Sequence, residues 1–578
     1  MIMKKSAGIP LLFVAAVLPL VTSFHIELND FSKYAWFPNQ EYWMDFFLYG
    51  KSRLLGMMGV LMLAILLIRL IKNRTFVFCK EKILLLLLIL FLVLSAVFSK
   101  FPEKSLSGSI EQYESLWVLL SYVILAVFSF YYTKNEKNRM LLVCALLFGL
   151  AMASVFGVLQ FFQCDFWNSE FGKEILIPES FSSLRDRLRF SEDFRGIGRV
   201  YMTLYNPTYA GIYLVMLLPF LFLMKNKFVK MMLIPSILCL VGTMSKSAWL
   251  TGVILLVTGG WLMASTVQLQ KWKFYKKIWL TAGVVCLVML AGAVFFSKNA
   301  VLTEGKRLQE ISAEKEYVRV VYEGNTLYMS EFPKDDSVTY KIVDEKGLEP
   351  MLLWVPERGE IDSQDPRFDD LHFKVYKKNE IGYIYVKFAE VIFRFTDELG
   401  TGKYEYISMN GKPDELKVAK TLLPIGDSLL NGRGYIWNRT IPLMFENVLF
   451  GTGPDTFLQV FPQDDYVARA NLGYGFFTEI LTNAHSFYLQ IGLQNGCVVL
   501  VCLLCLLGIY LKKSWKMYAH KECYDQNDRI GVACLLGSIG YLICGITFAS
   551  SVCTTPVFAI LVGMGLGMQP ISEKDVLA

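Results

Sequence analysis

The chain has 578 residues, of which 54% are hydrophobic and only 19% are charged. A soluble protein of this length carries about a quarter charged residues and no long apolar runs, so this composition excludes an ordinary cytosolic globular protein. The net charge of +6 does not indicate nucleic-acid binding, because the basic residues gather in short loops between apolar runs. The predicted fold class is an all-α polytopic membrane protein with a β-rich extracellular insert.

The apolar runs predict about twelve transmembrane helices, since a helix needs about 17–25 predominantly apolar residues to cross a bilayer. The runs lie at 7–24, 54–71, 83–99, 116–132, 140–162, 207–224, 229–244, 247–264, 278–296, 487–510, 530–549 and 552–568. No small-residue cleavage site follows the first run, so we interpret it as an uncleaved helix and not as a signal peptide. The Lys- and Arg-rich short loops then lie in the cytoplasm, which places both termini inside a cell (inner or plasma) membrane.

Two polar segments remain outside the membrane in this topology, one at 163–206 and a longer one that ends at 486. The longer segment alternates polar and apolar residues in Tyr317–Tyr322 and Gly382–Phe395, a pattern typical of strands. The predicted parts are N-terminal helices 1 to 9 (1–300), a β-rich extracellular module (301–425), an outer loop with motif residues (426–486) and C-terminal helices 10 to 12 (487–578).

The twelve cysteines show no metal-ligand spacing, and most lie in or beside apolar runs. We interpret them as small packing residues and predict neither a disulfide framework nor a metal site.

Four segments carry polar residues in a distinctive order. They are Arg199–Gly211 (RVYMTLYNPTYAG), Gly242–Leu250 (GTMSKSAWL), Gly432–Phe457 (GRGYIWNRTIPLMFENVLFGTGPDTF) and Asn483–Gly496 (NAHSFYLQIGLQNG). In this order they resemble the O-antigen ligase and polymerase family of membrane glycosyltransferases. That family shows an Arg before an Asn-Pro, a Ser-Arg turn, an Arg-x-x-x-Trp ahead of Gly-x-Gly-Pro-x-x-Phe, and a His-Asn-x-x-Leu-Gln. Leu106–Ser115 (LSGSIEQYES) is similar to the first large outer loop of the family.

The chain departs from the family pattern at three places. Lys246 stands where Arg is usual, which keeps the charge and loses the bidentate fork. Ser486 stands where Asn is usual, and the insert before Arg433 has no counterpart in short family members. These departures bear on the substrate more than on the reaction class.

The resemblance implies metal-independent, inverting transfer of a glycan from a polyprenyl diphosphate to an acceptor hydroxyl on the outer membrane face. It implies that His485 orients or deprotonates the acceptor, and that Arg199, Arg433 and Lys246 hold the diphosphate. Fixed cations suit that role, because they offset the charge of the leaving group. The implied partners are the lipid-linked glycan donor, a glycan or lipid-glycan acceptor and membrane lipids, without nucleic acid and without a cofactor.

Four further residues are predicted to support this site. Asn206 is expected to cap a helix that begins at Pro207, and Ser245 to cap the helix after the Lys246 turn. Asn483 is expected to cap a helix with His485 in its first turn, and Gln490 completes the His motif. All three helices would point their positive N-terminal ends to one membrane surface, where they suit a diphosphate.

The sequence leaves several alternatives open. Without the motifs, the favoured interpretation of His485 is a hydrogen-bonded histidine at the membrane interface, and that of the arginines is a solvated loop face or binding to lipid phosphates. Five acidic residues are unranked as candidate acids or bases: Glu111, Glu114, Asp427, Asp455 and Asp464. A polysaccharide flippase or transporter is the rival function, although we find no inverted repeat, and a membrane sensor with an extracellular binding domain is another. Polymerisation and ligation both fit the motifs, and we favour polymerisation.

Overall fold

The structure is a computed structural model. It describes residues 3–28, 33–37, 42–73, 80–190, 193–194, 197–264, 307–314, 316–334, 337–378, 381–397, 403–519, 521 and 523–570. The predicted run 278–296 lies outside the described residues, as does the basic loop 265–277 before it.

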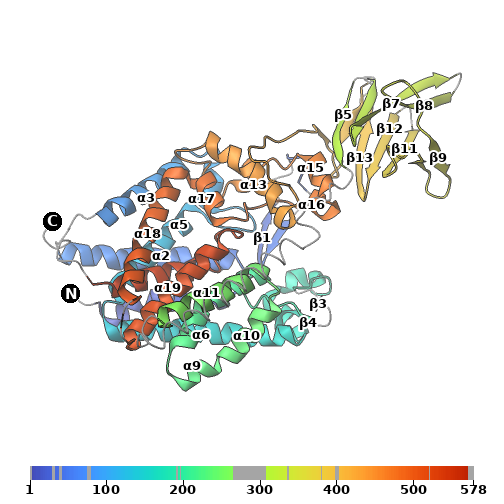
Figure 1. The fold of residues 1–578 in the computed structure, drawn as a ribbon. Coiled ribbons are helices and arrows are strands. Elements are labelled where there is room, and N and C mark those ends of the chain that lie inside the picture. The colour runs from blue at the N-terminus through green and yellow to red at the C-terminus, as the bar shows by residue number, and fades with distance from the viewer. Residues whose placement is uncertain are drawn as a thin grey trace.

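Most of the chain is helical, and the helices form one body from which the strands β5 to β13 project (Figure 1). The helices are α1 (Ile9–Ala16), α2 (Tyr49–Asn73), α3 (Lys80–Val97), α4 (Pro102–Ser107), α5 (Leu116–Tyr132), α6 (Glu136–Phe161), α7 (Glu170–Leu176), α8 (Pro207–Leu223), α9 (Lys227–Met231), α10 (Leu233–Gly242), α11 (Lys246–Ala264), α13 (Leu429–Glu446), α14 (Phe457–Val460), α15 (Tyr466–Asn471), α16 (Tyr474–Thr478), α17 (Phe487–Asn495), α18 (Cys497–Tyr518), α19 (Gln526–Cys544) and α20 (Thr555–Met568). In the core of this body α20 packs on α5, and α19 packs on α8. Helices from both ends of the sequence therefore build one common interior.

Three helical stretches in the described part of the chain are long and apolar enough to cross a membrane: Tyr49–Ile71, Glu136–Phe161 and Cys497–Tyr518. Shorter apolar helices lie at Lys5–Leu20, Leu116–Tyr132, Pro207–Leu223, Lys246–Leu262 and Thr555–Met568. Along α2 the side chains of Val60 and Ile71 are 64% and 74% exposed, which is typical of a surface that faces lipid. The chain is therefore a helical membrane protein, and the predicted number of about twelve spans is not confirmed.

The predicted continuous helix over 487–510 is wrong, because the chain breaks at Gly496 between α17 and α18. Gly496 has φ 87°, a conformation that side chains rarely adopt. A Cβ atom there would also lie 2.3 Å from the carbonyl oxygen of Leu449. Apolar periodicity continues across this position, so the pattern by itself did not reveal the break.

The β-rich module predicted for the polar segment is present, and it projects from one end of the helical body (Figure 1). In the described residues its strands form a four-stranded antiparallel sheet and a seven-stranded antiparallel sheet. The first contains β5 (Leu308–Ala313), β6 (Tyr317–Tyr322), β7 (Asn325–Lys334) and β8 (Ser337–Asp344). The second contains β9 (Leu352–Val355), β10 (Glu360–Ser363), β11 (Leu371–Lys378), β12 (Ile381–Phe388), β13 (Val391–Thr396), β14 (Glu405–Ile407) and β15 (Pro413–Asp414).

The two sheets share one hydrophobic core, because inward and outward residues alternate along the strands. In β12, for example, Ile384 and Val386 are fully buried, and Val386 pairs with Phe393 of β13. The core also takes in Tyr466 of α15 and Phe477 of α16. Side chains from the segment after the sheets therefore complete the core of the module.

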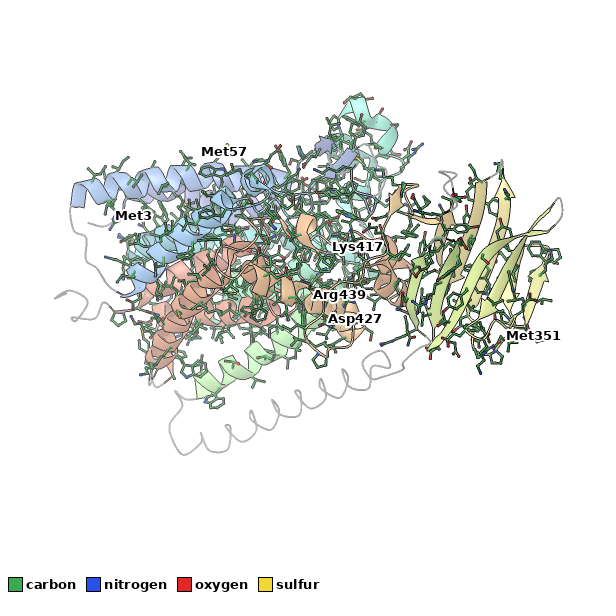
Figure 2. All side chains as sticks on the ribbon, turned by 90° about the horizontal axis from the view of Figure 1, so that it is seen from above. Met3, Met57, Met351, Lys417, Asp427 and Arg439 are labelled. Carbon is green, nitrogen blue, oxygen red and sulfur yellow. The ribbon has the colours of Figure 1, made fainter. Side chains whose placement is uncertain are left out.

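The two predicted outer segments contain further elements. Residues 163–206 hold α7 and the short strands β3 (Asp193–Phe194) and β4 (Ile197–Gly198), and residues 426–486 hold α13 to α16. Two more short strands, β1 (His25–Leu28) and β2 (Tyr42–Asp45), pair before α2. Met3 and Met351 lie at opposite ends of the molecule, with the helical body between the first residues and the β module (Figure 2).

Candidate active site

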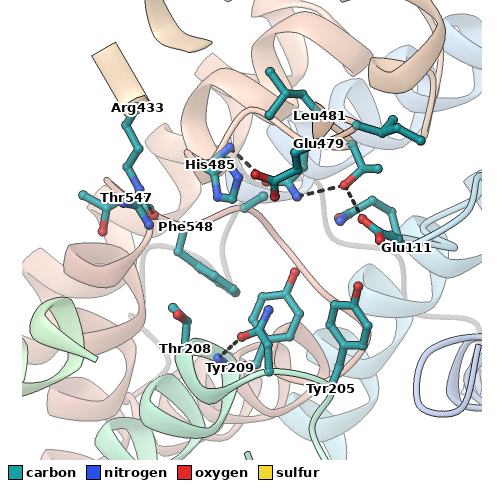
Figure 3. Close-up of a pocket in the computed structure, with 16 residues that line it drawn as sticks. Glu111, Tyr205, Thr208, Tyr209, Arg433, Glu479, Leu481, His485, Thr547 and Phe548 are labelled. Carbon is teal, nitrogen blue, oxygen red and sulfur yellow. Dashed lines mark hydrogen bonds between the residues drawn. The ribbon is translucent and has the colours of Figure 1, made fainter. Parts of the chain in front are cut away.

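A pocket of about 210 Å³ lies where the starts of α8 and α13 meet the loops before α17 and after α19 (Figure 3). Its lining residues are Glu111, Gln112, Tyr205, Asn206, Thr208, Tyr209, Arg433, Glu479, Ile480, Leu481, Thr482, Asn483, His485, Thr547, Phe548 and Ala549. Polar and ionisable side chains predominate among them, so the pocket suits a polar ligand better than an apolar one.

The start of α8 forms one wall of the pocket. Asn206 occupies the N-cap position, its Oδ1 accepts a hydrogen bond of 3.0 Å from the backbone N–H of Tyr209, and Pro207 takes the first helical position. This is the predicted cap, and it follows from the missing N–H of proline and the short amide side chain of asparagine. Because Asn206 and Thr208 line the pocket, the positive end of α8 faces it.

The loop that carries His485 forms the opposite wall. The Oδ1 atom of Asn483 accepts a 3.0 Å hydrogen bond from the backbone N–H of His485, and the Oε1 atom of Gln490 accepts one of 2.7 Å from Ala484. Asn483 thus holds the loop and does not cap α17, which begins only at Phe487. The prediction that His485 lies in the first turn of that helix is wrong, because its φ of 45° takes it out of the right-handed helical region.

Arg433 enters the pocket from the start of α13, immediately after three residues with positive φ, Leu430, Asn431 and Gly432. Gly432 is required there, since a Cβ atom would lie 2.3 Å from the ring of Phe476. The guanidinium donates 3.0 and 3.1 Å hydrogen bonds to the carbonyl oxygens of Leu430 and Thr547. These bonds fix the cation at the pocket and leave further N–H groups for a ligand.

The pocket groups have strongly shifted protonation equilibria. Burial, reinforced by the positive charge of Arg433, lowers the pKa of the His485 imidazole to about 4. Burial raises the pKa of the Glu111 carboxyl to about 7, against hydrogen bonds from Thr482 and Tyr205 that lower it. At neutral pH His485 is therefore uncharged, and Glu111 is present in both its protonated and its ionised form.

Three residues that line this pocket have a strained backbone conformation. Glu111, Tyr205 and His485 all line it, and their φ angles are 64°, 73° and 45°. Such conformations persist only where the surroundings hold them, and they are frequent at active sites. Shifted pKa values and strained backbone thus coincide in one polar cavity, which is typical of a catalytic site.

Comparison with known proteins shows which family one segment of the chain resembles. Residues 404–504 match the family model described as O-antigen ligase. The chain thus carries a segment that is similar to O-antigen ligases. Searches of curated proteins and of solved structures give no match.

The O-antigen ligase match runs from the last strands of the β module into α18 and includes Arg433 and His485. The rest of the pocket comes from outside the matched residues, namely from Glu111, Gln112, Tyr205, Asn206, Thr208, Tyr209, Thr547, Phe548 and Ala549. The family segment therefore forms one side of the pocket, and this chain completes it with distant loops.

The structure does not bring all of the predicted site residues together. Arg199 and Lys246 are exposed and lie outside the pocket lining. Ser245 caps α11 as predicted, since the N–H of Ala248 donates to its Oγ at 3.4 Å. This helix start packs against Gly211 on α8 and not at the pocket. Of the three helix starts expected to converge, α8 and the loop before α17 reach the pocket and α11 does not.

Several residues that line the pocket were not predicted from the sequence. Tyr205 lies within the quoted Arg199–Gly211 motif, but no signal distinguished it from its neighbours. Thr547 and Phe548 fall in the apolar run 530–549, which predicts a helix. In the structure α19 ends at Cys544, so both residues lie in the loop after it and line the pocket. Among the described residues no three His, Cys, Asp or Glu side chains gather as metal ligands would.

Proposed function

We propose that this protein transfers a polyprenyl-diphosphate-linked glycan onto an acceptor sugar hydroxyl at the pocket. The observation that carries the proposal is the meeting of Arg433 and an uncharged His485, both from the matched O-antigen ligase segment, in one polar cavity. A cation suits the diphosphate leaving group, and a neutral imidazole can accept a hydrogen bond from the attacking hydroxyl.

In the proposed reaction the acceptor oxygen attacks the anomeric carbon from the side opposite the diphosphate, which inverts the configuration. A new carbon–oxygen bond forms, the bond to the diphosphate breaks, and its electron pair stays on the diphosphate oxygen. Arg433 and the positive end of α8 offset the charge that develops there. His485 orients the acceptor hydroxyl or takes its proton.

The proposed setting is the outer face of the inner or plasma membrane, with both termini in the cytoplasm and the β module outside. Membrane lipids surround the helical body, so the polyprenyl chain of the donor can remain in the bilayer. Arg199 and Lys246 stay outside this reaction centre, and Arg433 is the cation that we assign to the diphosphate. Polymerisation of repeat units remains our preferred form of the reaction over ligation to a lipid acceptor.

The test is loss of transfer in pocket variants that insert correctly. His485→Ala should lower transfer about 100-fold or more, because the acceptor hydroxyl loses the group that orients it or takes its proton. Arg433→Ala should lower use of the donor, and Arg433→Lys should restore part of the loss, because lysine keeps the charge without the planar fork. The measurement is the carrier-linked glycan that accumulates in cells and the transferred glycan that disappears.

Two matched controls lie on the surface of the β module. His372→Ala and Arg358→Ala remove the same types of side chain as the pocket variants do. Both residues pair with Asp362, and neither lines the pocket. Both controls should transfer at the wild-type level. Normal transfer by His485→Ala would refute the assignment of His485, and normal transfer by cells without the protein would refute the function.

A further inference from the structure

We propose that Glu111 is a catalytic residue of this transfer: its carboxylate takes the proton of the acceptor hydroxyl, while His485 orients that hydroxyl. The inference rests on the proposed function and deepens it. It assigns to the loop between α4 and α5 a chemical role that neither the motifs nor the family match gives to it.

The first observation is the position of the carboxylate. Glu111 Oε2 accepts a 2.9 Å hydrogen bond from the hydroxyl of Thr482, and Thr482 Oγ1 accepts one of 3.4 Å from the side chain of Asn483. Asn483 in turn accepts from the backbone N–H of His485 (Figure 3). One continuous chain of hydrogen bonds thus sets Glu111 and His485 on the same wall of the pocket.

The second observation is the support of the loop that carries Glu111. Asp455 Oδ2 accepts hydrogen bonds of 2.6 and 2.9 Å from the backbone N–H groups of Ser109 and Glu114, on either side of Glu111. These bonds hold the loop in which Glu111 lines the pocket with a φ of 64°. This backbone conformation is unfavourable for a residue other than glycine, so the surrounding contacts must maintain it. Such support is expected of a positioned reactive group.

The third observation separates Glu111 from the other acidic candidates. Both oxygens of Glu114 accept hydrogen bonds, from Tyr122 and Ser550, and Asp455 is engaged with the backbone. Asp427 pairs with Arg439, and Asp464 pairs with Lys417. Of the five acidic residues named from the sequence, Glu111 alone lines the pocket.

Proton affinity favours the same division of roles. A general base works best when its pKa lies near the operating pH. The pKa of Glu111 is raised to about 7, chiefly by burial, with Glu479 and Asp45 raising it further and Thr482 and Tyr205 lowering it. The pKa of His485 is lowered to about 4 by burial and by Arg433, so its imidazole is a weak base. In the step, the hydroxyl proton passes to the carboxylate as the glycosidic bond forms, and the carboxylic acid then releases it to water.

The experiment compares Glu111→Gln with wild type and with Glu103→Gln, an exposed glutamate of α4 outside the pocket. The assay uses purified full-length protein with carrier-linked glycan, and measures kcat/KM from pH 5 to 9. Wild type should lose about tenfold per pH unit below about pH 7, because the active form is the carboxylate. Glu111→Gln should be about 100-fold slower at pH 8 and should lack this break, whereas Glu103→Gln should keep both.

Two further measurements keep the outcomes distinct. Glu111→Asp should recover part of the rate with the pH break present, and thermal unfolding in detergent should show that the Gln variant is folded. A folded Glu111→Gln that transfers at more than a tenth of the wild-type rate, or that keeps the pH break, would overturn the role of Glu111 and leave the transfer function intact. Wild-type protein that transfers no glycan would instead overturn the proposed function itself.

Discussion

At the scale of single residues, the charge of Arg433 and the neutrality of His485 belong together. Both side chains enter a pocket whose walls exclude much of the solvent, and the fixed cation makes a second positive charge unfavourable. An uncharged imidazole beside a guanidinium can accept a hydrogen bond from a substrate hydroxyl at any physiological pH. In the proposed reaction, His485 therefore orients the acceptor and Arg433 binds the leaving group.

This electrostatic coupling predicts the chemical reactivity of His485. Diethyl pyrocarbonate modifies only neutral imidazole, so modification of His485 should stay constant from pH 8 down to about pH 5, whereas free histidine loses reactivity below about pH 6.5. In Arg433→Met the pKa of His485 should rise towards its ordinary value, because the second cause of its depression is removed. Mass spectrometry of the modified peptide gives the result, and an unchanged profile in Arg433→Met would contradict the coupling.

At the scale of elements, the β module is connected directly to the pocket wall. Phe477 of α16 lies in the core of the module, and two residues later Glu479 lines the pocket. The guanidinium of Arg469 is buried and donates hydrogen bonds to the carbonyl oxygens of Gln463, Phe476 and Glu479. The short helices α15 and α16 therefore hold the insert and one wall of the pocket in a fixed arrangement.

The break between α17 and α18 gives a prediction for stability. Gly496→Ala should destabilise the protein by at least about 1–3 kcal/mol, because alanine is strained at φ 87° and its Cβ would meet the Leu449 carbonyl. Gly508→Ala in the interior of α18 is the matched control, since a Cβ there meets nothing within 4 Å. It should be neutral or stabilise the helix by up to about 1 kcal/mol. The unfolding temperatures of the two variants in detergent check this, and equal temperatures would contradict it.

At the scale of the whole molecule, the described start of the chain and the tip of the β module lie at opposite ends (Figure 2). The pocket lies in the helical body beside the segments that join it to the module. With the module outside the cell, an acceptor would approach the pocket from the external side, and the donor would approach through the membrane.

Native cysteines allow this orientation to be tested. Cys164 lies in the predicted outer segment, Cys523 lies in the predicted cytoplasmic loop between α18 and α19, and both are exposed. An impermeant maleimide should label Cys164 on intact cells and Cys523 only after permeabilisation. Mass spectrometry of the labelled peptides measures both reactions. A cysteine placed at Glu357, an exposed turn residue of the β module, should behave as Cys164 does. The opposite labelling pattern would reverse the proposed topology.

Much of this protein could be predicted from local patterns. Apolar runs indicate membrane helices, strand alternation indicates the β module, and Asn206-Pro207 indicates a helix start, because each depends on neighbouring residues and on backbone geometry. The ordered motifs likewise placed Arg433 and His485 among the candidate residues. These properties are carried by short stretches of sequence, so they survive without knowledge of the fold.

Only the tertiary structure decided which candidates meet. The sequence did not distinguish Glu111 from the other acidic candidates, whereas the structure places it beside Thr482 in the pocket. Phe548 lies in an apolar run, so its sequence context did not indicate that it lines the pocket. Arg199 and Lys246 are cations in the quoted motifs, as Arg433 is. The packing of the helices nevertheless leaves both of them exposed and outside the pocket. A pocket is formed by segments hundreds of residues apart, and its pKa values follow from burial and from neighbouring charges. Neither of these is a property of a local pattern.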